Sequence, residues 1–381
     1  MNFIADALNL SHSSARRLEE RNILRPALIH HPFFSDVIDA YCFGKRFGEF
    51  EEGTLVVQTS TRSVIVRGYP KIRRALTLYP TIKRRFDGEV VVEEKMNGYN
   101  VRIAKFGDNI YAITRRGFIC PYTTEKARES FNPDFFKDYP DLMFCSEAVG
   151  EESPFVPKKI YGVDGIEFFV FDIRDTRTNE ALPVNKKLRL SEEYGFKIAP
   201  ILCQTVASRA HREIQEIVSD LGIEGREGVV IKDPEMKKQP LKYTSSQSNC
   251  SDLSYAFRYF NEYAKDFMLS RIVREAFQSF EFREDEEALK ERCLRLGKSI
   301  LKPIIESIRD VQEGGKVVEK HRLKFRSLEV LELFKDHVRR MGIDANYLEV
   351  EERYGYYILN FERYMKSTTD KISHLIKGNV W

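Results

Sequence analysis

The chain has 381 residues, of which 42% are hydrophobic, and 61 basic against 58 acidic residues give a net charge of +3. This length exceeds that of one typical domain, and the nearly balanced charge does not by itself indicate a nucleic-acid partner. No apolar run approaches the ~18 residues that span a bilayer, so we expect a soluble protein with no membrane partner.

The first 22 residues carry acidic side chains early and lack a continuous apolar segment, which is typical of an amphipathic helix and not of a secretory signal. Six cysteines are scattered along the chain without a C-x-x-C pair or zinc-site spacing. We therefore expect reduced thiols and a cytoplasmic protein.

Short β-type runs dominate the chain from residue 52 onward. Residues 52–67 alternate β-branched and polar positions, and similar runs follow between 88 and 243, separated by Gly, Asn or Pro. A few helical segments, such as 208–222, lie between them. This pattern predicts an α+β fold with antiparallel or mixed sheets and attached helices.

The pattern changes after residue 252. Apolar residues recur at helical spacing in 253–280 and 285–312, and again in 317–342. We therefore predict that the C-terminal third is entirely helical. Its wide apolar faces would be buried against each other or against a second copy of the chain.

Lys95 leaves the β-type run 89–94 and enters a turn that contains Gly98. A lysine can be a nucleophile when its ammonium is deprotonated by desolvation or by neighbouring positive charge. The phosphate-binding loop, dinucleotide-binding and serine-hydrolase motifs are absent from the sequence. A K-x-x-G match alone is weak, because a surface lysine explains most such matches.

An ordered series of motifs follows Lys95: T114-R-R-G117, then Glu147 in MFCSEAVG, FFVFDI at 168–173, E227-G-V-V-I-K232, and Lys242 in LKYT. In this order and with these gaps, the series resembles the six collinear motifs of the covalent nucleotidyltransferases, which comprise polynucleotide ligases and mRNA capping enzymes.

The whole chain is similar to the homodimeric ATP-dependent RNA ligases of archaeal type. The resemblance implies an N-terminal module (1–66), an adenylyltransferase domain (67–246), a helical dimerisation domain (247–313) and a helical C-terminal domain (314–381). DNA ligases and capping enzymes continue instead into an OB-fold with many short strands. The helical pattern of 253–342 therefore favours an RNA ligase.

The resemblance also implies a reaction and its partners. Lys95 would attack the α-phosphorus of ATP to form lysyl–AMP, and the AMP would pass to the 5′-phosphate of an RNA. A 3′-hydroxyl would then expel AMP and seal the strand. The expected partners are single-stranded RNA with these ends, joined within one strand or between two, and a second copy of the chain.

The phosphate and metal contacts follow from the same resemblance. Lys232 and Lys242 match the family's phosphate-contacting lysines, which would also keep Lys95 unprotonated. Glu147 and Glu227 match acids that contact ribose or bind metal, and their oxygens suit Mg²⁺, or Mn²⁺ in its place.

The remaining matched residues would bind the nucleoside. Arg115 corresponds to an arginine on the sugar side, and Phe171 would stack on adenine opposite Val230. Backbone hydrogen bonds near Glu94, Lys95 and Gly98 would recognise the adenine.

Two positions depart from the family pattern. Asn97 stands where K-x-D-G has an aspartate, and Thr244 stands where the final K-x-K has its second lysine. The second change removes a phosphate contact, so either Lys232 and Lys242 act alone or a nearby basic residue substitutes.

Other functions stay open at this point. One is a DNA ligase or a capping-type nucleotidyltransferase. Another is a catalytically silent module that binds RNA through the basic clusters at residues 71–76 and 81–86.

Overall fold

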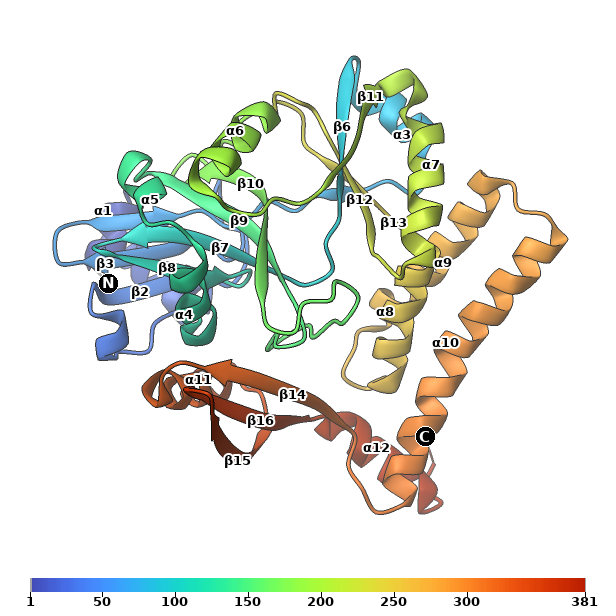
Figure 1. The fold of residues 1–381 in the computed structure, drawn as a ribbon. Coiled ribbons are helices and arrows are strands. Elements are labelled where there is room, and N and C mark those ends of the chain that lie inside the picture. Colours follow the sequence, from blue (N-terminus) through green and yellow to red (C-terminus); the bar gives the residue numbers. More distant parts are fainter. Residues whose placement is uncertain (1, 381) are drawn as a thin grey trace.

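The computed structural model describes residues 2–380 and confirms the predicted α+β fold with antiparallel and mixed sheets (Figure 1). Three sheets lie in the N-terminal and central parts of the chain. The long helices α9 (Lys265–Phe282) and α10 (Glu286–Gln312) project at one side, and a fourth sheet lies near the C-terminus.

The N-terminal part folds as a small sheet covered by two helices. Its elements are α1 (Asn2–Ala7), α2 (His12–Glu20), β1 (Leu24–Pro26), β2 (Val37–Phe43), β3 (Leu55–Thr59) and β4 (Ser63–Val66). The four strands are antiparallel in the order β1-β2-β3-β4. Because side chains alternate along a strand, Val56 faces the two helices while Leu55 and Val57 face the next sheet.

The second sheet lies between this module and three helices. Its antiparallel order is β10 (Glu167–Asp175), β9 (Leu142–Val149), β7 (Tyr99–Phe106) and β8 (Asn109–Thr114). Ala104 and Phe106 pack toward the N-terminal sheet, and Val101 and Ile103 pack on the opposite face. That face is covered by α4 (Pro121–Ser130), α5 (Asp134–Asp138) and α6 (Val184–Tyr194).

The third sheet has one apolar face and one charged face. Its order is β11 (Ile201–Val206), β6 (Glu89–Glu94), β12 (Gly228–Lys232), β13 (Leu241–Thr244) and β5 (Arg73–Arg74), and only the β13–β5 contact is parallel. Val90, Val92 and Val229 pack against α3 (Leu78–Arg85) and α7 (Ala207–Ile223). The intervening residues therefore point to the other side, where the charged side chains gather.

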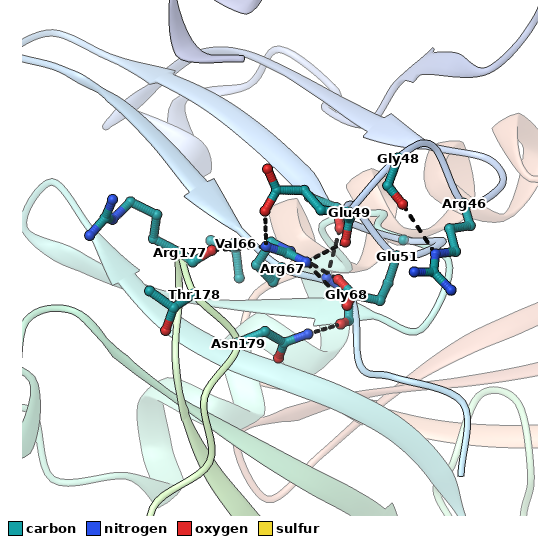
Figure 2. Close-up of polar contacts among 12 residues, drawn as sticks. Arg46, Gly48, Glu49, Glu51, Val66, Arg67, Gly68, Arg177, Thr178 and Asn179 are labelled. Atoms are coloured by element: carbon teal, nitrogen blue, oxygen red, sulfur yellow. Dashed lines mark hydrogen bonds and ion pairs between the residues drawn. The ribbon is translucent and has the colours of Figure 1, made fainter. Parts of the chain in front are cut away.

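Arg67 fastens the N-terminal module to the second sheet (Figure 2). Its Nε donates to Glu51 at 2.9 Å, its Nη1 donates to the Arg177 carbonyl at 3.2 Å, and its Nη2 donates to the Glu49 carbonyl. Arg102 on β7 is fully buried and donates to the Arg67 carbonyl at 2.6 Å. These contacts fix the segment that connects the two sheets.

The helical prediction for residues 253–280 and 285–312 is confirmed except at residues 259–264, which separate two helices. The chain forms α8 (Ser246–Arg258), α9 and α10, and Asp285 caps α10 by accepting a hydrogen bond from the Ala288 amide at 2.9 Å. None of the helices within residues 2–380 is long and apolar enough to cross a membrane.

The prediction of an entirely helical C-terminal third is wrong beyond residue 314. Here α11 (Leu328–Arg340) and α12 (Lys366–Ile376) accompany an antiparallel sheet in the order β14 (Val318–Phe325), β16 (Tyr356–Tyr364), β15 (Ala345–Arg353). Buried and exposed residues alternate along β14, but two of its buried residues, Glu319 and His321, are polar. The alternation therefore cannot be recognised from the positions of apolar residues in the sequence. The sheet has three strands, whereas an OB-fold has five.

The three boundaries between the four predicted domains stay a prediction. Elements end or begin close to each of them: β4 ends at Val66, α8 begins at Ser246, and α10 ends at Gln312.

Candidate active site

Lys95 directly follows β6 and lies on the charged face of the third sheet. Its backbone amide donates to the Gly228 carbonyl at 2.8 Å, which continues the β6–β12 pairing by one residue. Its Nζ donates to Glu227 Oε2 at 2.7 Å. Two motif residues that are 132 positions apart therefore form an ion pair.

The turn after Lys95 is held by backbone hydrogen bonds. A Cβ at Gly98 would lie 2.2 Å from the Ala148 carbonyl oxygen, so only glycine fits between β7 and β9 here. The Gly98 amide donates to Glu147 Oε1 at 3.3 Å, and the Asn97 amide donates to Tyr161 Oη at 2.6 Å. These bonds use the backbone amides of the turn and not the side chain at position 97, which is asparagine in this chain.

Carboxylates dominate the electrostatics around Lys95. Burial alone lowers the pKa of its ammonium, but the charges of Glu227 and Glu147 outweigh burial, so the pKa is raised. Burial also raises the pKa of Glu147, to about 7. The expectation that nearby lysines keep Lys95 unprotonated is thus wrong for the protein without nucleotide, because Glu227 is the closer charge.

An irregularity in β10 shapes the apolar slot. The β9–β10 register shifts between Val170 and Asp172, so Phe171 sits in a β-bulge, a feature that redirects a side chain. Tyr69 packs edge-on against the Phe171 ring, with centroids 5.0 Å apart. Phe171, Tyr69 and Val230 all line one cleft, which agrees with the slot predicted for a flat base.

Lys232 is engaged in a buried network beneath the cleft. Its side chain is 1% exposed, and Nζ donates to Glu93 Oε2 at 2.7 Å, to Asp172 Oδ1 at 2.8 Å and to the Phe171 carbonyl at 2.7 Å. Lys187 on α6 also donates to Glu93, at 2.6 Å. All three ammonium donors of Lys232 are used, so none is left for a phosphate in this state.

Lys242 lies on β13 with its ammonium unengaged. Among residues 2–380, no carboxylate lies within ion-pair distance of its Nζ. Burial, assisted by the positive charges of Arg74 and Lys95, lowers its pKa to about 8. Lys242 is thus the predicted phosphate lysine whose donors are available in the cleft.

Glu94 and Arg115 occupy different edges of the same cleft. The Glu94 carboxylate is buried and pairs with Arg226 at 2.8 Å, and its amide donates to the Pro200 carbonyl at 2.8 Å. Arg115 is exposed directly after β8. The Glu94 side chain therefore supports the strand end, while Arg115 is free to meet a ligand.

A cleft of about 1640 Å³ brings together the predicted residues except Glu227, which reaches it through its ion pair with Lys95. It is lined by Lys95, Glu94, Gly98, Arg115, Glu147, Phe171, Val230, Lys232 and Lys242. The N-terminal module contributes Arg25, and the C-terminal part contributes Arg340 and Arg363. The cleft is therefore built from both ends of the chain as well as its centre.

The donor set near Lys95 fits a cation that shares its coordination with a ligand. Across residues 2–380, no group of three or more His, Cys, Asp or Glu side chains is placed to hold a metal. Glu147 and Glu227 both act on Lys95, and two carboxylates suit a hard cation that keeps water and takes phosphate oxygens.

Sequence reasoning missed Tyr69 and Tyr161. Tyr69 Oη donates to Asp172 Oδ2 at 2.8 Å, and it precedes Lys95 by 26 residues, outside the motif series. Tyr161 lies in an irregular segment between β9 and β10. The segment Gly68-Tyr69-Pro70 lies outside the motif series, so its sequence alone does not indicate a ligand.

Comparison with known proteins agrees with this geometry. The family model described as RNA ligase matches residues 88–244, and that described as Ligase Pab1020 C-terminal region matches residues 255–379. The chain is also 39% identical to an uncharacterized protein of Methanocaldococcus jannaschii, over 100% of this chain and 97% of that protein.

Three solved structures share nearly the whole fold. Two are described as archaeal ATP-dependent RNA ligase: one has a TM-score of 0.89 and 37% identity over 97% of this chain and 96% of that chain, and the other 0.91 and 36% over 100% and 99%. The third, a putative ATP-dependent DNA ligase from Aquifex aeolicus, has a TM-score of 0.89 and 26% identity over 97% and 100%.

The fold and the lysine-centred cleft define a polynucleotide ligase of the covalent nucleotidyltransferase class. Within that class, the chain belongs to the archaeal ATP-dependent RNA ligases. The predicted family and enzyme class are therefore confirmed.

Proposed function

We propose that this ligase seals RNA 5′-phosphate and 3′-hydroxyl ends through lysyl–AMP and RNA-adenylate intermediates. The observation that carries the proposal is the position of Lys95, which lies in one cleft with the apolar slot at Phe171 and the unengaged ammonium of Lys242. ATP is the nucleotide, and the RNA is single-stranded, joined within one strand or between two.

In the first step, Lys95 Nζ forms a bond to the α-phosphorus, and the bond from that phosphorus to pyrophosphate breaks. Glu227 Oε2, 2.7 Å from Nζ, is placed to accept the proton that the amine must lose. Lys242, which lines the same cleft, would stabilise the charge that builds on the α-phosphate oxygens. Phe171 and Val230 hold the adenine between them.

Glu147 and Glu227 are the residues that would hold Mg²⁺, with Mn²⁺ as the alternative. The bound cation would supply positive charge to the phosphate oxygens. Glu147 keeps its Oε1 oriented toward the turn by accepting the Gly98 amide at 3.3 Å, which fixes the carboxylate beside Lys95.

The RNA would enter along the basic edge of the cleft. Arg25 of the N-terminal module, Arg116 and Arg340 of the C-terminal part are exposed and line it. Guanidinium groups bind phosphate through paired hydrogen bonds, so a single strand passing this edge would be held by its backbone.

We further propose that the enzyme is a homodimer. Large apolar side chains are exposed along one helical hairpin, α9 and α10: Leu269, Val273, Phe277, Phe280, Leu289, Leu294, Leu301 and Ile305. Phe280 is 81% exposed. A contiguous apolar helical surface of this kind is typical of an interface, and a second copy would bury it symmetrically.

The first test is incubation of the protein with Mg²⁺ and ATP labelled at the α-phosphate, followed by denaturing electrophoresis. We expect a labelled band from wild type and from Lys45→Ala, an exposed-lysine control, and no band from Lys95→Ala. Folding of Lys95→Ala is checked by circular dichroism. A folded Lys95→Ala protein that is labelled like wild type would refute the role of Lys95.

The second test identifies the acceptor. We expect label from ATP and not from GTP, and sealing of 5′-phosphorylated RNA rather than DNA of the same sequence. Preference for GTP or DNA would instead support a capping-type enzyme or a DNA ligase. RNA binding without any adenylylation would support the silent module.

A further inference from the structure

An arginine side chain, that of Arg74, lies beside Thr244, the position at which the motif series lacks a lysine. Thr244 stands in place of the second lysine of K-x-K, and its hydroxyl accepts a hydrogen bond from Arg74 Nη1 at 2.8 Å. Arg74 precedes Lys242 by 168 positions and lies before the first motif. No linear motif connects the two.

Strand register explains how Arg74 reaches this place. β5 pairs in parallel with β13, and Arg74 lies opposite Lys242. Residues opposite each other in register, and residues two apart along a strand, point to the same face of a sheet. Arg74, Lys242 and Thr244 therefore share the face that carries Lys95.

The guanidinium of Arg74 is available to a ligand. Throughout the described part of the chain, residues 2–380, no carboxylate lies within ion-pair distance of it, and Thr244 is its one hydrogen-bond partner among side chains. It borders a small cavity together with Thr244 and Arg274. A partly buried arginine without a carboxylate is costly to retain unless an anion binds it.

The surrounding charges also indicate an anion. Burial lowers the pKa of Arg74, and the positive charges of Arg74 and Lys95 both act on Lys242. Arg274 on α9 adds a further cation next to Arg74. Arg74 and Arg274 thus border a small cavity beside Lys242, and Lys242 itself lines the nucleotide cleft.

We propose that Arg74 replaces the missing lysine at position 244 as a catalytic phosphate contact, and that its guanidinium binds an α-phosphate oxygen of ATP while Lys95 attacks. This inference rests on the adenylyl transfer proposed above. The Thr244 hydroxyl orients the guanidinium by its hydrogen bond, while the remaining N–H groups of Arg74 meet the phosphate.

The contribution of Arg74 is to the transition state. As the Lys95 nitrogen bonds to phosphorus and pyrophosphate leaves, negative charge is redistributed over the phosphate oxygens. A fixed cation beside those oxygens lowers the barrier, and removing one such donor costs about 10²–10³-fold in rate in other enzymes.

The test measures the single-turnover rate of Lys95 adenylylation in the full-length protein, with α-labelled ATP and Mg²⁺ and without RNA. Arg74→Gln removes the charge but keeps a polar side chain with N–H donors, and it breaks no ion pair, so the fold should be retained. We expect a loss of about 10²–10³-fold. Arg73→Gln is the matched control, because Arg73 is the exposed neighbour on the same strand and points to the other face.

A rescue experiment separates a phosphate contact from a structural role. In Arg74→Ala/Thr244→Lys, the introduced lysine extends from the family's own position into the space that Arg74 vacates. We expect this double variant to adenylylate at least tenfold faster than Arg74→Ala. A purely structural arginine would not be replaced by a lysine on another strand.

The outcomes distinguish the two proposals. If wild type is not adenylylated, the proposed function fails. If wild type is adenylylated and Arg74→Gln reacts within threefold of it, the role of Arg74 is refuted while the function stands. If Arg74→Ala is folded and slow but Thr244→Lys gives no recovery, Arg74 is not the substitute for the missing lysine. If Arg74→Ala does not fold, Arg74→Gln alone decides.

Discussion

At the scale of single residues, the cleft holds three lysines with three different environments. Lys95 is paired with Glu227, Lys232 is enclosed by acceptors, and Lys242 has a free ammonium. We therefore expect the same side-chain type to act as nucleophile, structural cation and phosphate ligand according to its partners. On this proposal, the charge of Lys242 is the property that nucleotide binding uses.

The lowered pKa of Lys242 leads to a prediction of how ATP binding depends on pH. Its pKa is lowered to about 8, so the free protein loses this charge as the pH rises through 8, well below the usual range of a lysine. We expect the KM for ATP in adenylylation to rise between pH 8 and 9.5 in wild type. Lys242→Arg keeps its charge and should show a flatter profile. Parallel profiles for the two proteins would exclude Lys242 as the titrating contact.

At the scale of elements, the buried network of Lys232 joins three strands and a helix. Glu93 comes from β6, Asp172 from β10, Lys232 from β12 and Lys187 from α6. The network therefore connects β6, which ends directly before Lys95, to the strand that bulges at Phe171. We infer that it holds the two walls of the nucleotide cleft at a fixed separation.

This network predicts that Lys232 and Lys242 respond differently to mutation. Lys232→Met leaves Glu93 and Asp172 short of a buried cation, and we expect a loss of about 3–5 kcal/mol in the free energy of unfolding. Lys242→Met breaks no ion pair and should change it by less than about 0.5 kcal/mol. Urea unfolding followed by circular dichroism measures both. If Lys232→Met keeps wild-type stability but loses adenylylation, Lys232 contacts phosphate as its motif position implies.

Sequence predicted the elements that carry motifs and missed those that lack them. Lys95, Glu147 and Phe171 were predicted because the order and spacing of their motifs can be recognised in the sequence alone. Arg74 was missed because β5 has two residues, too few for any periodicity, and the bulge at Phe171 depends on pairing with β9. The C-terminal sheet was missed because β14 buries the polar side chains of Glu319 and His321, which a hydrophobic pattern does not detect.

At the scale of the whole molecule, the C-terminal part closes the cleft by contacts with two other parts. Lys324 on β14 pairs with Glu152 at 2.8 Å, and Arg340 donates to the Leu28 carbonyl of the N-terminal module at 3.1 Å. The helical hairpin α9–α10 stands apart from these contacts (Figure 1). Its exposed apolar surface is therefore free to meet a second copy without blocking the cleft.

The assembly prediction follows from that surface. Leu294→Glu/Leu301→Glu places two charges on α10 where the apolar side chains would be buried between copies, because both leucines are exposed in one chain. We expect sedimentation velocity to show a dimer for wild type and a monomer for the variant. Leu348→Glu on β15, outside the hairpin, is the control and should stay dimeric. A monomeric wild type would contradict the homodimer.

The third sheet is completed by β5 and β13, and this pairing limits the order in which parts of the protein can fold during synthesis. The N-terminal sheet is complete when Val66 has emerged, but the strand that carries Lys242 and pairs with Arg74 ends only at Thr244. At the usual 5–20 residues per second, roughly 10–35 s of translation separate the two points. For most of that interval Lys95 is outside the ribosome without Lys242. We therefore expect that a nascent chain cannot form lysyl–AMP before Thr244 has emerged.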